Sequence, residues 1–320
     1  MKPPQILVTG GAGFIGSHLV ERLLREGNAV TVLDDCSTGS AENLRAVSSH
    51  PDLRLVRAKV SNCEGLDEIV ANSSFIFHLA AAVGVELVVH SPIRTIETNL
   101  HETEAILQSA GKGGIPVLLA STSEVYGKSQ KPVFSEEDDL LIGPPHLGRW
   151  SYACSKLMDE FLALAYAKEK GLSVVIVRIF NTVGPRQTGR YGMVLPRFIA
   201  AAKAGLPLKV FGDGRQTRCF CYVADTVEAV TRLRSSPSAA GEVFNVGGTE
   251  EISILELAEM VVRVLDSKST IEFIPYGEAY AAGFEDMQRR RPVVEKLHRT
   301  VDFRPSTPLQ RIIELTASAA

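Results

Sequence analysis

Short aliphatic and β-branched runs alternate with longer amphipathic segments over the first half of the chain. Continuous apolar runs of this length are typical of strands that are buried on both faces, and the segments between them have helical periodicity. Regular alternation of strand and helix predicts β–α–β units and therefore a parallel, doubly wound sheet. The segments that carry this pattern are 6–9, 17–26, 29–33, 54–58, 75–79, 93–110, 117–121, 152–170 and 173–180.

The pattern changes after Asn181, where residues 182–192 are rich in glycine and polar side chains. We expect a smaller, mixed α/β domain to begin there and to bind the substrate. The larger domain is assigned residues 1–181 plus about 222–250, and the smaller one about 182–221 plus 251–320. The sequence further predicts a hairpin turn at Gly212–Gly214, a strand at 242–246, and helices at 195–204, 222–234 and 254–265, the last being the final helix expected.

Size and charge favour small-molecule chemistry. The chain has 320 residues, of which 45% are hydrophobic, and a net charge of -3 with both signs mixed throughout. This distribution offers no basic field for nucleic acid. The N-terminus lacks an apolar signal segment and no run approaches the roughly 18 apolar residues of a membrane span, so we expect a cytoplasmic protein. Five cysteines without paired ligand spacing predict reduced thiols and no metal site.

A glycine-rich turn follows the first predicted strand and opens the first helix, with Gly10, Gly13 and Gly16 in the G-x-x-G-x-x-G arrangement. Gly10 allows a tight turn, Gly13 allows the backbone to approach a pyrophosphate at the positive end of the helix, and Gly16 allows close packing of helix on strand. The second strand ends at Asp34, near the ~20-residue offset expected for a carboxylate that binds the adenosine ribose. The sequence therefore predicts a Rossmann-type site for NAD, because the carboxylate would repel the 2′-phosphate of NADP.

Tyr152 and Lys156 have an i, i+4 spacing that places both side chains on one helical face. A nearby ammonium group can lower the pKa of a phenol and make it a useful base. Tyr166 and Lys170 repeat the spacing, but residues 152 and 166 would lie ~21 Å apart along a helix. The second pair comes in the last turn before Gly171, so we interpret it as core packing plus a cationic helix end.

The predicted strand 117–121 ends in hydroxyl groups and one carboxylate. Ligands of open parallel sheets bind at the carboxyl ends of strands. Thr122 is therefore placed to hydrogen-bond a reacting hydroxyl, and Glu124 could act as a second acid or base.

Taken together, these motifs resemble the extended short-chain dehydrogenase/reductase family, and within it the nucleotide-sugar epimerases, dehydratases and decarboxylases. The resemblance covers nearly the whole chain. It rests on TGGAGFIGSHL at 9–19, HLAA at 78–81, STSEVYG at 121–127, Tyr152 with Lys156, RIFNTVGPRQ at 178–187, GDGRQTRCFCYVAD at 212–225 and NVGG at 245–248.

The resemblance implies an internal redox cycle in which tightly held NAD oxidises the sugar at C4 and later returns the hydride. It assigns Tyr152 as the base at the C4 hydroxyl, Lys156 as ribose ligand and tuner of that tyrosine, and Thr122 as the group that orients the hydroxyl. The substrate implied is a nucleotide sugar, expected to be UDP-linked, that would contact Asn181, Arg218 and Arg290. Further cofactor contacts are expected from Phe14, Ile15, Leu79, Ala80, Ala81, Asn99 and Ser121.

Glu124 distinguishes the reactions of this family. Its STSE context, and Arg149–Trp150 ahead of Ser151–Tyr152, are similar to UDP-glucuronate decarboxylases, in which Arg290 would also act. A UDP-sugar 4-epimerase needs no carboxylate at this position but some share the motif, and a 4,6-dehydratase would have aspartate in place of Ser123. A non-catalytic NAD-binding regulator and a net NAD-dependent reductase are the remaining alternatives.

Two more expectations follow from the resemblance. The family usually has an acidic residue after the third strand that contacts adenine, and Lys59 in this region puts that contact in doubt. The helices at 93–110 and 152–170 would pair with those of a second copy, giving a homodimer.

Overall fold

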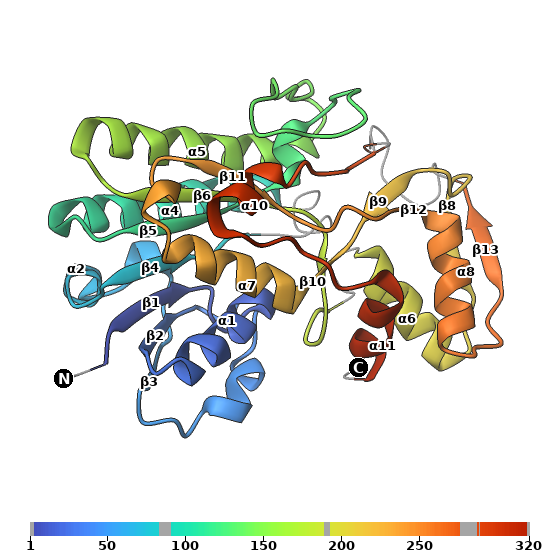
Figure 1. Cartoon of the computed structure of the whole chain (residues 1–320), viewed down its shortest axis with the longest axis horizontal. Coiled ribbons are helices and arrows are strands. Elements are labelled where there is room, and N and C mark those ends of the chain that lie inside the picture. Colours follow the sequence, from blue (N-terminus) through green and yellow to red (C-terminus); the bar gives the residue numbers. More distant parts are fainter. Residues whose placement is uncertain (1–2, 83–90, 189–192, 276–286, 288, 319–320) are drawn as a thin grey trace.

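The computed structural model describes residues 3–82, 91–188, 193–275, 287 and 289–318 (Figure 1). Its centre is a seven-stranded sheet with the order β11-β6-β5-β4-β1-β2-β3, in which all neighbours are parallel. The predicted α/β, doubly wound sheet is therefore confirmed. The strands are β1 Gln5–Thr9, β2 Ala29–Leu33, β3 Leu53–Val56, β4 Phe75–His78, β5 Val117–Thr122, β6 Val174–Ile179 and β11 Val243–Val246.

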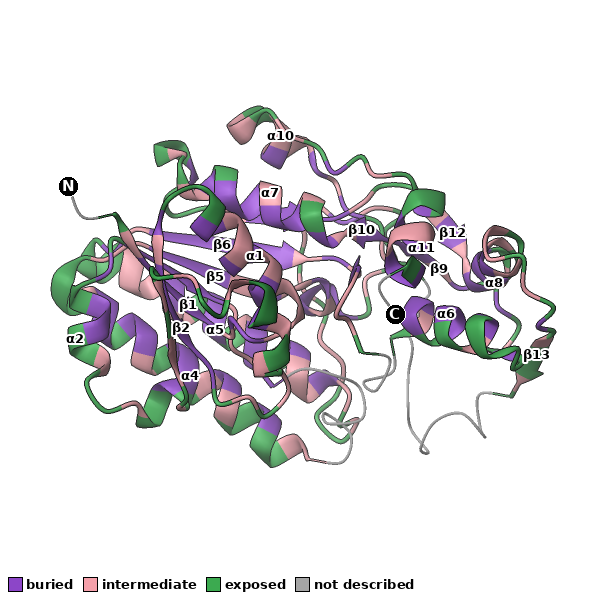
Figure 2. Ribbon diagram, turned by 90° about the horizontal axis from the view of Figure 1, so that it is seen from below, coloured by how far each residue is buried: buried purple, intermediate pink, exposed green. Residues whose placement is uncertain are grey.

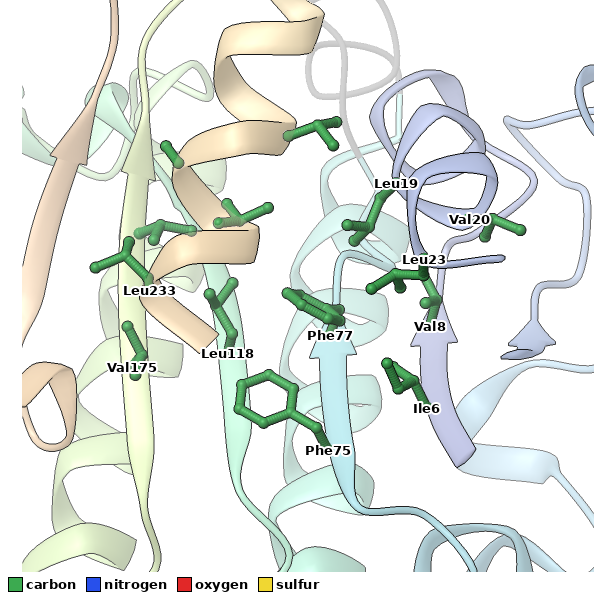
Figure 3. Packing of buried hydrophobic residues seen from close by; sticks show 14 of the residues in the cluster. Ile6, Val8, Leu19, Val20, Leu23, Phe75, Phe77, Leu118, Val175 and Leu233 are labelled. Carbon is green, nitrogen blue, oxygen red and sulfur yellow. The ribbon is translucent and has the colours of Figure 1, made fainter. Parts of the chain in front are cut away.

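Helices cover both faces of this sheet, and the sheet strands are accordingly buried (Figure 2). Alternate residues of β1 face opposite layers, as strand geometry requires. Ile6 and Val8 pack with α1, α7 and α10, whereas Leu7 packs with α2, α4 and α5. Figure 3 shows the first layer, where Leu19 and Leu23 of α1 meet Phe77 of β4. The helices are α1 Phe14–Arg25, α2 Leu66–Ala71, α4 Pro92–Gly113, α5 Trp150–Lys170, α7 Val223–Arg234 and α10 Glu295–Val301, with short 3₁₀ turns η1 Ala41–Val47, η2 Val60–Asn62, η3 Ser123–Tyr126 and η5 Pro237–Ala239.

A smaller unit with its own apolar cluster lies beyond the carboxyl ends of the strands (Figure 1). Its helices enclose the buried side chains of Leu195, Leu257 and Ile313. The elements are α6 Val194–Ala204, β8 Leu208–Phe211, β9 Thr217–Cys219, β12 Glu251–Ser253, α8 Ile254–Val264, β13 Ile271–Ile274 and α11 Leu309–Ser318. The parallel pair β7 Thr182–Val183 and β10 Cys221–Tyr222 lies between the two units.

The hairpin predicted at Gly212–Gly214 is wrong. Both glycines have positive φ and do form a turn, but β8 pairs with β13 in parallel and β9 pairs with β12 in antiparallel fashion. After the turn the backbone bonds to the start of α8 instead, because Leu255 N donates to the carbonyl of Gly214. Turn chemistry predicted the change of direction but could not specify the partner strand.

Helix 254–265 is not the last one, since α10 and α11 follow it. Helix α11 buries Leu309, Ile312 and Ile313. Their i, i+3, i+4 spacing is typical of a helix and could have predicted this one. Helix α10 packs on α7 and β11, and its Leu297 belongs to the core of the sheet. Part of the segment 251–320 thus lies against the larger unit. Among the helices of the described ranges, none is long and apolar enough to cross a membrane.

A buried ion pair fastens α5 to the sheet. The guanidinium of Arg178 on β6 donates to both carboxylate oxygens of Glu160 on α5, with Nη2 2.7 Å from Oε2, and Ser121 on β5 donates to the same carboxylate. Arg178 also donates to the hydroxyl of Tyr126 at 3.1 Å. Both side chains of the pair are less than 7% exposed. The helix that carries Tyr152 is thereby held in one position relative to the strand ends.

Replacing Arg178 by methionine should leave the Glu160 carboxylate buried without its cation, which typically costs about 3–5 kcal/mol. Chemical denaturation followed by circular dichroism measures the loss in free energy of unfolding. The control is Arg45→Met, which breaks a pair with Glu42 whose side chains are 81% and 67% exposed and should change stability little. Equal effects of the two substitutions would contradict the anchoring role of Arg178.

Candidate active site

One large cavity, with a volume of about 1010 Å³, lies where the strand ends of the sheet face the smaller unit. Strands β1 and β4 are neighbours here although the chain forms β2 and β3 between them, so the strand order reverses at this point. Such a switch point is where open α/β sheets bind ligands. The cavity is lined by all five residues expected to be catalytic, namely Thr122, Glu124, Tyr152, Lys156 and Arg290, and by Asn181 and Arg218.

The glycine loop has the geometry that its sequence predicted. Gly10 has a φ of +71°, and a Cβ there would lie 2.7 Å from the backbone nitrogen of Ala80. A Cβ on Gly16 would lie 2.1 Å from the carbonyl oxygen of Gly10. Gly13 is the N-cap of α1 and caps it without a side chain, so the N–H groups of the first turn face the cavity end of the helix unshielded. Phe14, Ile15 and Gly16 line the cavity and offer an anion site.

Asp34 joins the end of β2 to the glycine loop. One carboxylate oxygen accepts the N–H of Ala12 at 2.9 Å and the other that of Cys36 at 2.8 Å. Burial raises the pKa of Asp34, against the effect of these two bonds. An ionised carboxylate has about four acceptor sites, so it can still accept hydroxyl groups of a ribose. The residues present therefore fit NAD, with Gly10, Gly13 and the first turn of α1 toward the pyrophosphate.

Most other expected cofactor contacts also line the cavity, and one does not. Leu79, Ala80, Ala81 and Ser121 are part of its wall. Asn99 is not. Its amide oxygen accepts the N–H of Ala82 and its amide nitrogen donates to Ser155, so both ends are used inside the protein. We correct its role to support of the loop after β4, because the buried amide has its partners there.

Near the expected adenine end, the structure supplies a carboxylate that the sequence analysis missed. Lys59 and Val60 line the cavity, as does Glu102 of α4. Glu102 is 4% exposed and accepts the backbone N–H of Val60 at 2.5 Å and the hydroxyl of Ser61 at 2.6 Å. The acidic residue of this region thus comes from another element. No local pattern could have shown it, since 42 residues separate Glu102 from Val60.

Tyr152 lies at the start of α5 and is hydrogen-bonded to Thr122 at the end of β5. Burial raises its pKa, the negative charges of Glu124 and Asp159 raise it further, and only the bond with Thr122 lowers it. The ammonium group of Lys156 is engaged elsewhere, because its Nζ lies 2.7 Å from Oδ2 of Asp159. The expected lowering of the tyrosine pKa by Lys156 is therefore absent in this structure, since an adjacent carboxylate neutralises the lysine.

The second tyrosine and lysine pair behaves as predicted. Tyr166 packs against the core between α4 and α5, and a Cβ at Gly111 would lie 3.3 Å from its ring. Lys170 is exposed in the last turn of α5, which Gly171 ends with a φ of +66°. Neither side chain lines the cavity. Of the two pairs, only Tyr152 and Lys156 line the cavity.

Glu124 is held between two arginines. Oε1 lies 2.5 Å from Nη1 of Arg290 and Oε2 lies 3.1 Å from Nη2 of Arg149. Burial alone would raise the pKa of Glu124, but Arg290, Arg149 and Arg218 outweigh it, and the pKa is lower than usual. Arg149 was noted only as part of a sequence pattern. Its place three residues before Tyr152, one helical turn away, is the signal that could have found it.

The remaining substrate residues lie on the side of the smaller unit. Arg218 on β9 is 8% exposed and lines the cavity, as does Asn181, whose amide donates to the carbonyl of Cys219 at 3.0 Å. Arg289 bonds to Glu251 of β12 at 2.7 Å, away from Glu124. Arg218 and Arg290 thus line the cavity together with the amide of Asn181, and this set of donors suits a diphosphate.

Comparisons with known proteins agree with this site. Residues 6–247 match the NAD dependent epimerase/dehydratase family. The UDP-N-acetyl-alpha-D-glucosaminuronate decarboxylase of Bacillus cytotoxicus is 42% identical over 311 residues, covering 97% of this chain and 95% of its own. UDP-glucuronic acid decarboxylase 1 of Danio rerio is 35% identical, covering 98% of this chain and 71% of its own.

Solved structures share the fold. The UDP-glucuronic acid 4-epimerase of Bacillus cereus, in complex with UDP-glucuronic acid and NAD, has a TM-score of 0.87 at 28% identity, covering 98% of both chains. The UDP-N-acetylglucosamine 4-epimerase of Methanobrevibacter ruminantium has a TM-score of 0.90 at 28% identity, covering 100% of this chain and 98% of its own. The glycine loop, Asp34 and Tyr152 of this protein line its cavity and agree with the family match. The chain belongs to the NAD dependent epimerase/dehydratase family.

Proposed function

We propose that this protein is a nucleotide-sugar decarboxylase that acts on a UDP-linked uronate through a transient 4-keto sugar. The observation that carries the proposal is the ionised Glu124, bound by Arg290 and Arg149 next to Tyr152. Two relatives that match almost the whole chain are named decarboxylases of UDP-linked uronic acids, which supports the same choice.

The first step is oxidation at C4, in which NAD, when bound, takes the hydride and later returns it. Tyr152 accepts the proton of the C4 hydroxyl, and Thr122, to which Tyr152 is hydrogen-bonded, orients that hydroxyl. Gly10, Gly13 and Asp34 hold the cofactor, and Arg218 with Asn181 holds the nucleotide diphosphate.

The second step uses the chemistry of the ketone. A C4 ketone is β to the C6 carboxylate, so breaking the C5–C6 bond releases carbon dioxide and leaves its electron pair in an enolate spread over C5, C4 and O4. A proton taken from water at C5 restores the ketone and leaves hydroxide, which the released carbon dioxide takes up as bicarbonate. The ketone is then reduced at C4 while Tyr152 returns its proton to O4. Arg290 and Arg149 stabilise the negative charge as it moves, and Glu124 keeps both guanidinium groups in place.

A UDP-uronate 4-epimerase is the second candidate, favoured by the likeness to the Bacillus cereus enzyme. It would use the same Tyr152 and Thr122 but would have no need of an ionised Glu124 between arginines. The dehydratase alternative is weaker because Ser123 stands where an aspartate is expected. Retention of Tyr152 and Lys156 in the cavity argues against a non-catalytic NAD-binding regulator.

Assembly as a homodimer is part of the proposal. Helices α4 and α5 pack side by side and carry large exposed hydrophobic side chains, with Ile93 72%, Phe161 62% and Met158 51% exposed. Pairing this face with a second copy would remove apolar surface from water. All five cysteines are free thiols, which supports a reducing compartment such as the cytoplasm.

Incubation with UDP-glucuronate or UDP-N-acetylglucosaminuronate, without added NAD, should release carbon dioxide and yield a UDP-pentose, or its acetamido counterpart. Mass spectrometry of the nucleotide sugar and trapping of carbon dioxide measure this. An unchanged mass with inverted configuration at C4 would establish the epimerase instead. Stoichiometric accumulation of NADH would support the reductase.

Glu124→Gln should lower the decarboxylation kcat by roughly 10²–10³-fold, because the amide no longer holds two guanidinium groups in place. Oxidation at C4 should survive, so NADH absorbance at the site should build up in a single turnover. The control is Glu137→Gln on the same connection, whose side chain is 86% exposed. A Glu124→Gln enzyme with full decarboxylation activity would remove the main support for the proposal.

Phe161→Glu should convert the dimer to a monomer, because a charge would have to be buried in the proposed apolar interface. Size-exclusion chromatography with light scattering measures the mass. Glu169→Gln, an exposed change later on α5, serves as control. A monomeric wild-type protein would contradict the proposed assembly.

A further inference from the structure

Lys156 has a partner that its assigned role does not explain. Its ammonium nitrogen lies 2.7 Å from Oδ2 of Asp159, one turn later on α5. The two side chains are 2% and 0% exposed, so the pair is almost fully removed from water. Removing both charges from water costs more than their attraction commonly returns, so such a pair is weak evidence for stability alone. A role in the chemistry of the neighbouring Tyr152 is the better explanation.

Asp159 is buried beside two polar side chains. Burial raises the pKa of Asp159, whereas Lys156 and the nearby hydroxyl of Thr103 on α4 lower it, and a ring nitrogen of His78 on β4 lies 3.2 Å from that hydroxyl. Burial lowers the pKa of His78 to about 3, so this imidazole is neutral and adds no charge. Thr9, at the start of the glycine loop, closes the chain of bonds with His78 at 2.8 Å.

The other charged groups around Tyr152 are already paired. Glu160, on the same helix, is bound by Arg178 of β6. Glu124 of η3 is bound by Arg149 and Arg290, with Arg218 contributing from β9. Lys156 is therefore the cation whose effect on the phenol depends on Asp159. A charge compensated at 2.7 Å acts on a neighbour as a dipole, whose field falls faster with distance than that of a free charge.

We propose that Asp159 is a positioning residue of the reaction: it holds the ammonium group of Lys156 and thereby decides how much of that positive charge reaches the hydroxyl of Tyr152. With the pair formed, Tyr152 keeps its proton. Drawing Lys156 away from Asp159 strengthens its effect on the phenol and favours the phenolate. The contact between Asp159 and Lys156 thus regulates how readily Tyr152 loses its proton.

The proposal rests on Tyr152 being the base of the proposed function, but its test needs no substrate. Phenolate absorbance is followed during a pH titration of the purified protein. Subtracting the same titration of Tyr152→Phe isolates this tyrosine from the other six in the chain. A wrong substrate assignment would leave this measurement unaffected and would show only in the decarboxylation assay.

In the wild type, the Tyr152 phenolate should be missing up to pH ~10, the ordinary tyrosine value, because Glu124 and Asp159 oppose ionisation. In Asp159→Asn it should form at a pH lower by about one unit or more, since a negative charge is removed and a positive one is freed. The rising limb of kcat against pH should move the same way, because a base with a lower pKa is ready at lower pH. Asp159→Glu should restore most of the wild-type behaviour.

Two comparisons decide the outcome. The shift caused by Asp159→Asn should shrink in a Lys156→Met background, and a shift of undiminished size there would overturn the proposal, as would an unchanged titration in Asp159→Asn itself. Asp159→Ser removes the same charge with a smaller side chain and replaces Asp159→Asn if that variant does not fold. Glu169→Gln, exposed near the end of α5, is the matched control and should titrate like the wild type.

Discussion

The parallel pairing of β1 with both β2 and β4 is the constraint on which the rest of the structure depends. Both faces of these strands are buried, so polar groups can gather only where the strands end. The turn after β1, Asp34 after β2 and the hydroxyl groups after β5 consequently meet along one edge. The smaller unit then closes the opposite side of the cavity and adds Arg218. The strand order of the sheet thus determines which polar side chains meet in the cavity.

Charge compensation organises the site once the edge exists. Among the residues that the structure describes, three carboxylates near Tyr152 each have a cation: Glu124 has two arginines, Glu160 has Arg178 and Asp159 has Lys156. The hydroxyl of Thr122 lowers the pKa of Tyr152, against the effect of burial and of Glu124 and Asp159. Such a site can hold opposite charges in a small volume at rest. A substrate that brings a diphosphate and a carboxylate must then rearrange pairs that already exist.

Sequence reasoning placed residues correctly where the signal is local. The glycine turn after β1, Asp34 after β2, and the positions of Tyr152 at the cavity and Tyr166 at the core follow from short spacings and from the order of strands. It failed where partners are distant in sequence. Glu102 of α4 accepts a hydrogen bond from the backbone of Val60, 42 residues away in the sequence. Arg149 donates a hydrogen bond to Glu124, which lies 25 residues away. Asp159 is close to Lys156 in sequence, yet its effect is visible only because both are buried. The hairpin prediction was wrong because the residues of a turn do not determine which strand pairs with which.

The path of the C-terminal segment has a mechanical consequence. Helix α10 packs on α7 and β11 of the larger unit, whereas α11 packs on α6 and α8 of the smaller one. The chain also crosses between the two units after β6, at β10 and after β11, so several connections join them rather than a single hinge. Two units joined by several connections resist a large hinge motion that would separate them. The two sides of the cavity therefore keep a fixed relative position, because several segments of chain and two packed helices join them.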